Sequence, residues 1–309
     1  MKVLVTGGAG FIGSSVVEKL LADGDEVLLL DDFSTGDRHN LEHLMDNADL
    51  SILEGDIRDR AIVDQAAGQA DATVHLAALA SVSRATESPD LACAVNVTGT
   101  LNVLEGARWN GHSRFVYVSS AAVYGSPRAL PLKEDAPTLP VGVYGASKLA
   151  GEVFTHSFRT TYGLSTVALR LFNVYGPRQR PNQRGVIQSF IADSARKNAI
   201  TVYGDGRQAF DFVFVEDVAE AVRKALRSDA VGPFNVGTGR ATSVNELVHV
   251  FARKKPRLKV IRAEARPGEV RLSRASTART ARILGWRART KLREGLERCY
   301  EHFPLSQKR

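Results

Sequence analysis

Cysteine is scarce in this chain, because only Cys93 and Cys299 occur among its 309 residues. They lie far apart in the sequence, which favours a reduced cytoplasmic protein without disulfides or a thiolate metal site. Long hydrophobic runs are also missing, since no apolar stretch approaches the roughly 18 residues that span a bilayer. The short apolar run at the first residues leads directly into glycines, which is unlike a signal peptide. We therefore expect no membrane association and no bound metal.

Acidic residues are few near the end of the chain. From Phe251 onward there are 18 Lys or Arg against 5 Asp or Glu, so the first 250 residues are net negative. A basic region is typical of a nucleic-acid interface, of an anionic substrate site or of an Arg-rich solvated surface. The arginines are scattered and few aromatic residues lie among them. We therefore expect a solvated surface with no nucleic-acid partner, in which one or two arginines bind a phosphate.

The first half of the chain alternates short apolar runs with segments of helical spacing. The predicted strands are Lys2–Thr6, Glu26–Asp31, Leu50–Glu54, Ala72–Leu76, Arg114–Ser119 and Ser165–Leu171. The predicted helices include Phe11–Ala22, Ala61–Ala67, Pro89–Trp109 and Tyr144–Tyr162. Alternation at this spacing implies right-handed crossovers, so it predicts an α/β fold with a doubly wound parallel sheet of the Rossmann type.

The alternation becomes irregular after a loop rich in proline and glycine that begins at Gly176. We therefore assign residues 1–175 to the main domain, and residues 176–209 and 239–309 to a smaller C-terminal α/β domain. Phe210–Val215 is predicted as a further strand, which is followed by a helix from Val218. We expect residues 210–238 to return to the main domain and its sheet.

A glycine-rich turn follows the first predicted strand, in the order Gly7-Gly8-Ala9-Gly10-Phe11-Ile12-Gly13. Glycines at these positions permit a tight turn, a close approach of the backbone to a pyrophosphate, and close packing of the next helix. The N-terminus of that helix offers free N–H groups to the phosphates. The second strand ends at Asp31-Asp32, where an acid binds the adenosine ribose and disfavours a 2′-phosphate. The pattern predicts a dinucleotide site for NAD, and the absence of a P-loop argues against an ATPase or kinase.

A tyrosine and a lysine, Tyr144 and Lys148, open a helix at positions i and i+4 and so share one helical face. The strand before this helix ends at Ser119 and Ser120. Ligands of doubly wound sheets bind beyond the carboxyl ends of the strands. We therefore predict that Ser120, Tyr144 and Lys148 form a catalytic group. The alternatives are a surface pair for the tyrosine and lysine, and a serine with only structural bonds.

Together these residues resemble the extended short-chain dehydrogenase/reductase superfamily in its sugar-nucleotide epimerase/dehydratase branch, and within it the UDP-glucose 4-epimerase type. The resemblance covers nearly the whole chain. Its motifs are Thr6–Gly13, Gly55–Asp59, His75–Ala78, Asn96–Thr100, Ser119–Gly125, Tyr144–Lys148, Arg170–Pro177 and Arg266–Glu269. It implies an NAD-dependent isomerase that epimerises C4 of a UDP-sugar such as UDP-glucose or UDP-galactose.

The resemblance also implies residues that bind the cofactor and the substrate. The implied cofactor residues are Gly7, Gly10, Phe11, Ile12, Gly13, Asp31, Asp32, Phe33, Ser34, Thr35, Gly36, Asp56, Ile57, Leu76, Ala77, Ala78, Ala80, Asn96, Ser119, Tyr144, Lys148 and Phe172. The implied substrate residues are Ser81, Ser120, Tyr144, Asn173, Gly185, Val186, Ile187, Val202, Arg207, Arg266 and Ser273. By the same resemblance, His75 at a strand end is structural.

The implied mechanism depends on the protonation of Tyr144. An ordinary tyrosine has a pKa near 10, so it is a poor base at neutral pH. The positive charges of Lys148 and of oxidised nicotinamide would lower this pKa. Tyr144 would then take the proton of the C4 hydroxyl, directly or through Ser120, while C4 loses hydride to NAD+. The 4-keto sugar turns over and is reduced on its other face, so NAD is regenerated and should copurify.

At three positions this chain has a different residue from many relatives. Dehydratases and decarboxylases of the branch carry an acid where this chain has Ala122, which favours simple epimerisation. Many relatives have an arginine that meets the diphosphate where this chain has Phe210, and we expect Arg207 as its substitute. A small residue, Ser273, stands where relatives wall the 2-substituent of the sugar. The last feature predicts that N-acetylated sugars are accepted, and uronic sugars also stay open.

Two classes of alternative function remain. One is another reaction on the same scaffold, such as a ketoreductase or dehydratase that acts on a nucleotide sugar. The other is a non-catalytic NAD-sensing or RNA-binding protein of the same fold, since fold alone does not prove function.

The helices Pro89–Trp109 and Tyr144–Tyr162 carry apolar residues on more than one stripe. With the family resemblance, they predict a homodimer with a four-helix interface, unless both faces are buried within one subunit.

Overall fold

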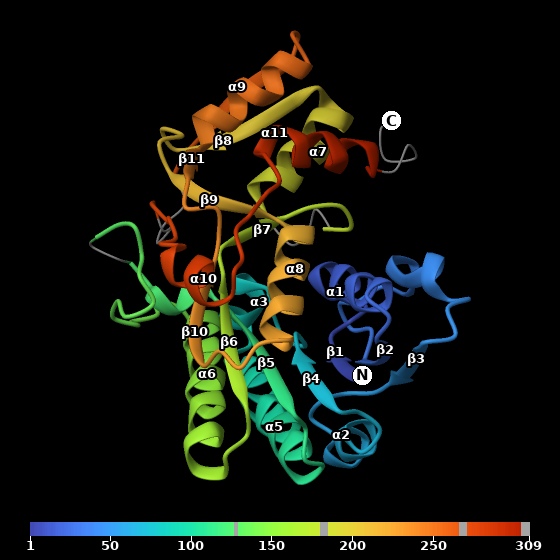
Figure 1. Cartoon of the computed structure of the whole chain (residues 1–309). Helices are drawn as coiled ribbons and strands as arrows, with labels where there is room; N and C mark the ends of the chain where they lie inside the picture. The colour runs from blue at the N-terminus through green and yellow to red at the C-terminus, as the bar shows by residue number, and fades with distance from the viewer. Residues whose placement is uncertain (127–128, 180–184, 266–270, 304–309) are drawn as a thin grey trace.

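The computed structural model describes residues 1–126, 129–179, 185–265 and 271–303. Within these ranges, the largest sheet has seven parallel strands in the order β10-β6-β5-β4-β1-β2-β3 (Figure 1). Their bounds are β1 Lys2–Thr6, β2 Glu26–Asp31, β3 Leu50–Glu54, β4 Ala72–His75, β5 Arg114–Ser120, β6 Thr166–Leu171 and β10 Gly232–Val236. The predicted doubly wound Rossmann-type sheet is confirmed. Its strand order reverses between β1 and β4, and a crevice at such a point is where ligands bind.

Helices cover both faces of this sheet because successive strand residues point to opposite sides. Val3 and Val5 of β1 pack into one buried cluster with α1 (Phe11–Ala22) and α8 (Val215–Leu226). Leu4 packs on the other side. Its cluster includes residues of the helices α2 (Arg60–Ala67), α5 (Thr100–Trp109) and α6 (Val143–Tyr162). Because neighbouring side chains of each strand point to opposite faces of the sheet, a separate hydrophobic core forms on each face.

The segment predicted as one helix from Pro89 to Trp109 is interrupted. It consists of α4 (Pro89–Cys93), a turn of π-helix η2 (Ala94–Gly99) and α5, and a short helix α3 (Val82–Glu87) precedes it. A π-turn widens the backbone by one residue and often occurs near functional sites. The next long helix, α6, ends at Tyr162 and is capped by Gly163, whose φ of 74° is the left-handed conformation that glycine readily adopts.

A smaller layer lies above the main sheet in Figure 1. It contains the strands β7 (Asn173–Tyr175), β9 (Ala209–Phe214) and β11 (Ala241–Ser243) in one sheet and β8 (Ala199–Tyr203) with β12 (Lys259–Ala263) in another. The helices α7 (Val186–Lys197), α9 (Val244–Lys254) and α11 (Leu292–Glu301) supply the rest of its core. The remaining short helices are η1 (Arg38–Leu44), η3 (Ala121–Tyr124) and α10 (Ala278–Ile283).

The prediction that the strand at Phe210–Val215 joins the main sheet is wrong. This strand is β9, and it pairs with β7 and β11 in the smaller layer. The helix after it, α8, and the strand β10 do return, because α8 packs on α1 and β10 pairs with β6. The chain therefore passes between the two layers several times. The division into two domains stays a prediction.

No helix within the described residues is long and apolar enough to cross a membrane.

Candidate active site

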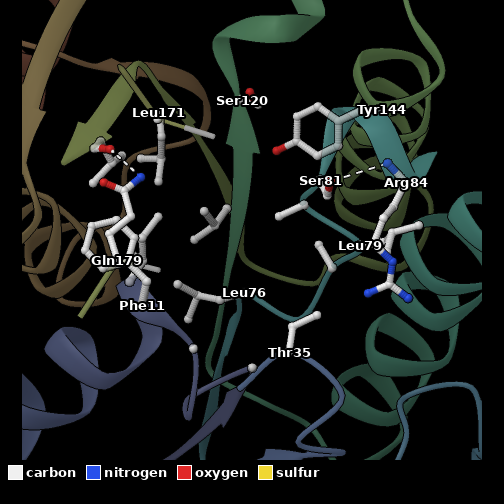
Figure 2. A pocket seen from close by; sticks show the side chains of 18 of the residues that line it. Phe11, Thr35, Leu76, Leu79, Ser81, Arg84, Ser120, Tyr144, Leu171 and Gln179 are labelled. Carbon is white, nitrogen blue, oxygen red and sulfur yellow. Dashed lines mark hydrogen bonds between the residues drawn. The ribbon is translucent and has the colours of Figure 1, made fainter. Parts of the chain in front are cut away.

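A cavity of about 1100 Å³ lies between the carboxyl ends of the main strands and the smaller layer. Residues that follow β1, β2, β4, β5 and β6 form one wall, and α7, β8 and β9 contribute the other. Figure 2 shows Tyr144, Ser81 and Leu79 on one side and Leu171 and Gln179 across from them. The cavity is large enough for more than one small molecule, since ordinary ligand pockets hold roughly 300–1,000 Å³.

The glycine turn forms the floor of the cavity, where Gly7, Gly10 and Gly13 all line the wall. Gly7 has a φ of 72°, and a Cβ on Gly13 would lie 2.1 Å from the carbonyl oxygen of Gly7. No side chain fits between this turn and the start of α1, so bare backbone faces the cavity. This cradle fits the pyrophosphate of a dinucleotide at the N-terminus of a helix.

The acids after β2 line the cavity beside this turn. The Asp31 carboxylate accepts hydrogen bonds from the N–H groups of Ala9, at 2.9 Å, and Phe33, at 2.9 Å. Burial raises the pKa of Asp31 above its ordinary value, against the effect of these two bonds. A carboxylate offers about four acceptor sites, so Asp31 keeps capacity for ribose hydroxyls. The geometry fits a dinucleotide with a free 2′-hydroxyl.

Ser120 and Tyr144 meet at the upper part of the cavity in Figure 2. Ser120 is the last residue of β5, and its hydroxyl accepts the N–H of Ala122 at 3.1 Å, which leaves its proton free to be donated. Tyr144 projects from the first turn of α6. Burial raises the pKa of Tyr144, and a hydrogen bond with Ser120 lowers it. In the protein alone the effect of burial is the larger one, so the pKa of Tyr144 lies above its ordinary value.

Lys148 lies one turn after Tyr144 and also lines the cavity, although its side chain is only 3% exposed. Its ammonium nitrogen lies 4.4 Å from the ring centroid of Tyr117 on β5. Burial lowers the pKa of Lys148 to about 7, against an opposing effect of Glu152. The structure thus brings Ser120, Tyr144 and Lys148 together around one cavity, as expected for a catalytic group.

His75 has a structural environment, in agreement with expectation. Its two ring nitrogens bond the hydroxyls of Thr6, at 2.6 Å, and Thr100, at 2.9 Å. Burial is the main cause that lowers its pKa to about 3, and the charge of Lys148 adds to it. The ring is therefore neutral at physiological pH, and it does not line the cavity.

Most of the predicted cofactor residues line the cavity, but Asn96 and Phe33 do not. Asn96 is buried in the π-turn, where it accepts the N–H of Leu79 at 2.7 Å and donates to Ser147 at 2.8 Å. It therefore supports the wall from behind. Phe33 has a φ of 54°, and its ring packs on the main core and under the guanidinium of Arg38.

The predicted substrate residues divide in the same way. Ser81, Ser120, Tyr144, Asn173, Gly185, Val186 and Ile187 line the cavity. Val202 is buried in the core of the smaller layer, and its neighbours Thr201 and Tyr203 line the cavity instead. Arg207 is exposed and lies outside the cavity wall, so it does not replace the missing arginine.

Ser273 is also absent from the wall. It is buried, and its N–H donates to the carbonyl of Ala209 at 3.0 Å. The argument that its size makes room for an N-acetyl group therefore fails. Arg266 lies outside the described residues.

Several lining residues were not predicted from the sequence. They include Arg58, Arg84, Tyr175, Gln179, Phe190, Gln208 and Phe212. The side-chain oxygen of Gln179 is buried and has no hydrogen-bond partner in the described part of the chain. Among the described lining residues the cations are Arg58, Arg84 and Lys148, and all three belong to the main-sheet side. Gln179 lies in a loop and Phe212 lies on a strand, and neither position has a sequence pattern that predicts contact with a ligand.

Residues 4–299 match the protein family described as GDP-mannose 4,6 dehydratase. The chain is 39% identical to a UDP-glucose 4-epimerase of Mycolicibacterium smegmatis, over 98% of each protein. Its structure superposes with a TM-score of 0.94 on the UDP-N-acetylglucosamine 4-epimerase of Methanobrevibacter ruminantium, in complex with UDP-N-acetylmuramic acid. That pair is 34% identical over 99% of this chain and 98% of the other. The UDP-glucose 4-epimerase of Thermus thermophilus, in complex with NAD, gives a TM-score of 0.88 at 38% identity over 98% of each chain.

Proposed function

The chain belongs to the GDP-mannose 4,6-dehydratase family of extended short-chain dehydrogenase/reductases, and from this membership we propose that it is an NAD-dependent 4-epimerase of UDP-sugars. The observation that carries the proposal is the meeting of Ser120, Tyr144 and Lys148 at one end of a cavity whose other end is the glycine turn. Two epimerases that act on UDP-sugars, with different 2-substituents, superpose on 99% and 98% of the chain.

The residues that would hold NAD are those of the glycine turn, Asp31 beside the ribose, and Lys148 near the nicotinamide ribose. When bound, NAD+ supplies the hydride acceptor for C4 and later the hydride that returns to it. Because the coenzyme is restored in every turnover, it is a resident cofactor. Purified protein should therefore release NAD when it is denatured.

The chain's own residues move a proton and orient the sugar. Tyr144, as a phenolate, takes the proton of the C4 hydroxyl directly or through Ser120. In the second case the Ser120 hydroxyl accepts the proton of the sugar and donates its own to Tyr144. Tyr144 gives the proton back when the ketone at C4 is reduced on its other face. The positive charges around the phenol are what make it a base, since the protein alone raises its pKa.

Substrate recognition must hold the nucleotide while the sugar turns over. Gln179 lies across the cavity from Tyr144 (Figure 2), and Asn173 and the N-terminus of α7 at Gly185 also line the cavity, so we assign these groups to the nucleotide and its phosphates. The sugar lies nearer Ser81 and Tyr144. Incubation with UDP-, dTDP- and GDP-sugars, followed by chromatography, tests the proposal. Conversion of UDP-glucose or UDP-N-acetylglucosamine to its C4 epimer, without net absorbance change at 340 nm, is expected.

A dehydratase or ketoreductase is the alternative on the same scaffold. Residue 122, in η3 directly after the strand that ends at Ser120, is an alanine, so this position supplies no acid for elimination of water. A 4-keto-6-deoxy product or stoichiometric use of NADH in the same assay would refute epimerisation.

We predict weak binding of the diphosphate, because Phe210 stands where many relatives have an arginine that contacts it. Its ring lines the cavity and packs edge-on against Phe212 at 6.1 Å. Phe210→Arg should tighten the binding of UDP about tenfold, because a hydrogen bond to a charged group contributes roughly 1.5–3 kcal/mol. Titration calorimetry with UDP measures the effect. As the matched control, Arg207→Ala should leave the affinity unchanged, since Arg207 is exposed outside the wall. Equal affinity in Phe210→Arg and the parent would contradict the assignment.

We also propose a homodimer that pairs α5 and α6 of two subunits. Trp109, Val153 and Tyr162 on these helices are 66%, 54% and 47% exposed, which is unusual for large apolar side chains. Val153→Glu should shift sedimentation from dimer to monomer. Val260→Glu, at an exposed position of β12, should not. A parent that sediments as a monomer would contradict the proposal.

We also propose a cytoplasmic location, because both cysteines are free and disulfides are rare in that compartment.

A further inference from the structure

Positively charged side chains gather at one end of the smaller layer, where α7 and α9 end and β12 begins. We call this surface the basic tip, and its members are Arg196, Lys197, Arg253, Lys254, Lys255, Arg257 and Lys259. Figure 1 shows α9 on the side of the smaller layer that faces away from the main sheet. None of these seven residues lines the cavity, so the basic tip is separate from the candidate active site.

Three hydrogen bonds join the two chain segments that form the basic tip. The side chain of Asn198 donates to the carbonyl of Arg257 at 3.1 Å, and the N–H of Lys259 donates to the carbonyl of Asn198 at 3.0 Å. The ammonium group of Lys255 donates to the carbonyl of Ser194 at 2.6 Å. Cations that are scattered along the sequence are therefore neighbours in the fold.

The positive charge of the basic tip exceeds what its surroundings neutralise. Asp193 pairs with Lys197 at 3.4 Å. Glu301 follows Tyr300, whose ring centroid lies 4.4 Å from the ammonium nitrogen of Lys254. The C-termini of α7 and α9 add about half a negative charge each. When both acids are counted in full, these groups offset about three of the seven positive charges, and about four remain.

The cations at the centre of the basic tip have no partner in the described part of the chain. Arg253, Arg257 and Lys259 are exposed, and within the described ranges their side chains form no ion pair or hydrogen bond. Val260 and Ile261, which follow on β12, are 41% and 51% exposed. In the described part of the chain β12 pairs only with β8, so it is an edge strand. Unpaired cations and exposed aliphatic side chains thus lie on one surface.

This combination fits an anionic lipid surface better than a nucleic acid. Single-stranded nucleic acids bind where their bases stack on exposed aromatic side chains, whereas Val260 and Ile261 are aliphatic. Anionic headgroups attract each Lys or Arg that comes close to them. Aliphatic side chains can also enter the boundary between headgroups and acyl chains.

We propose that the basic tip docks this protein on a membrane surface rich in anionic phospholipid. This contact needs no helix that crosses the bilayer, and the described residues contain none. The proposal replaces the expectation, drawn from the sequence, that this region is only solvated and that the protein does not associate with membranes. The cavity stays accessible in the docked protein, because the basic tip contributes nothing to its wall.

Flotation with lipid vesicles tests the proposal. The purified protein should float at low salt with vesicles of phosphatidylglycerol and phosphatidylcholine in equal parts, but not with vesicles of phosphatidylcholine alone. Binding should be lost at about 1 M salt, where charges interact over only about 3 Å. Arg257→Glu combined with Lys259→Glu should lower the partition coefficient at least about tenfold, because each cation near an anionic surface contributes to binding. The neutral pair Arg257→Gln and Lys259→Gln should give an intermediate loss.

The matched control is Arg287→Glu combined with Arg289→Glu. Both arginines are exposed in the segment between α10 and α11, beside Trp286, which donates to a carbonyl of α8. This variant has the same net charge as the charge-reversed variant of the basic tip, but it should bind the vesicles as tightly as the parent. The melting temperature and NAD content of the basic-tip variants should not change, since both substituted side chains are exposed and unpaired.

Failure of the parent to float with the anionic vesicles at low salt would overturn the proposal. Equal losses in the two charge-reversed variants would also overturn it, because binding would then follow net charge alone. Binding of the parent to polyuridylate but not to vesicles would assign the basic tip to a nucleic acid instead. None of these measurements uses a substrate, so their outcome is independent of the proposed epimerase activity.

Discussion

Tyr144→Phe should lower kcat for 4-epimerisation by about 10²–10⁴-fold, because this is the usual contribution of a positioned acid–base group. The substitution removes one hydroxyl from the wall of the cavity and leaves the ring, so α6 and the glycine turn are not disturbed. Steady-state conversion of UDP-glucose, followed by chromatography, measures the loss. NAD released on denaturation should match that of the parent protein.

The comparison with Ser120→Ala separates the two hydroxyls. Ser120 can relay a proton but is not itself the base, so its loss should reduce kcat less than the loss of Tyr144. Turnover by Tyr144→Phe within a few-fold of the parent would show that another group takes the C4 proton.

Gly13→Ala should strongly weaken NAD binding. A Cβ at this position would lie 2.1 Å from the carbonyl oxygen of Gly7 and 2.7 Å from the Cα of Gly8, so the backbone that faces the pyrophosphate must move. We expect the NAD content of the purified protein to fall by about tenfold or more, because the pyrophosphate needs this close backbone approach. Absorbance of the released nucleotide measures it.

Gly142→Ala is the control for this change. Nothing lies within 4 Å of a Cβ at Gly142, which precedes α6 in an extended conformation. Its NAD content and melting temperature should be those of the parent. Retention of full NAD content by Gly13→Ala would show that the dinucleotide does not use this turn.

The main sheet and the meeting of Ser120, Tyr144 and Lys148 around one cavity could be predicted because their signals are local. Alternating apolar runs identify the strands, and the helix Phe11–Ala22 was predicted with its bounds. The position of Tyr144 and Lys148 at i and i+4 fixes them on one face whatever surrounds them. The glycine turn could be predicted for the same reason, because the pattern of three glycines lies within seven consecutive residues and does not depend on distant parts of the chain.

The errors concern properties that depend on distant parts of the chain. A strand pattern does not name its partners, so β9 was assigned to the main sheet although it pairs with the three-residue strands β7 and β11. Asn96 matches a motif of the family, but the π-turn directs its side chain to Leu79 and Ser147. Arg207 follows Gly206, whose φ is 71°, and the turn directs Arg207 to solvent.

The repeated passage of the chain between its two layers has a consequence for how the protein is made. In the smaller layer, the paired strands β9 and β11 are separated in the sequence by α8 and β10, which pack with the main sheet. Neither layer is therefore an uninterrupted stretch that could be expressed alone or exchanged with a relative. Contacts this remote in sequence form slowly. During synthesis the cleft can close only after the ribosome has released β10 and β11, which lie in the final third of the polypeptide.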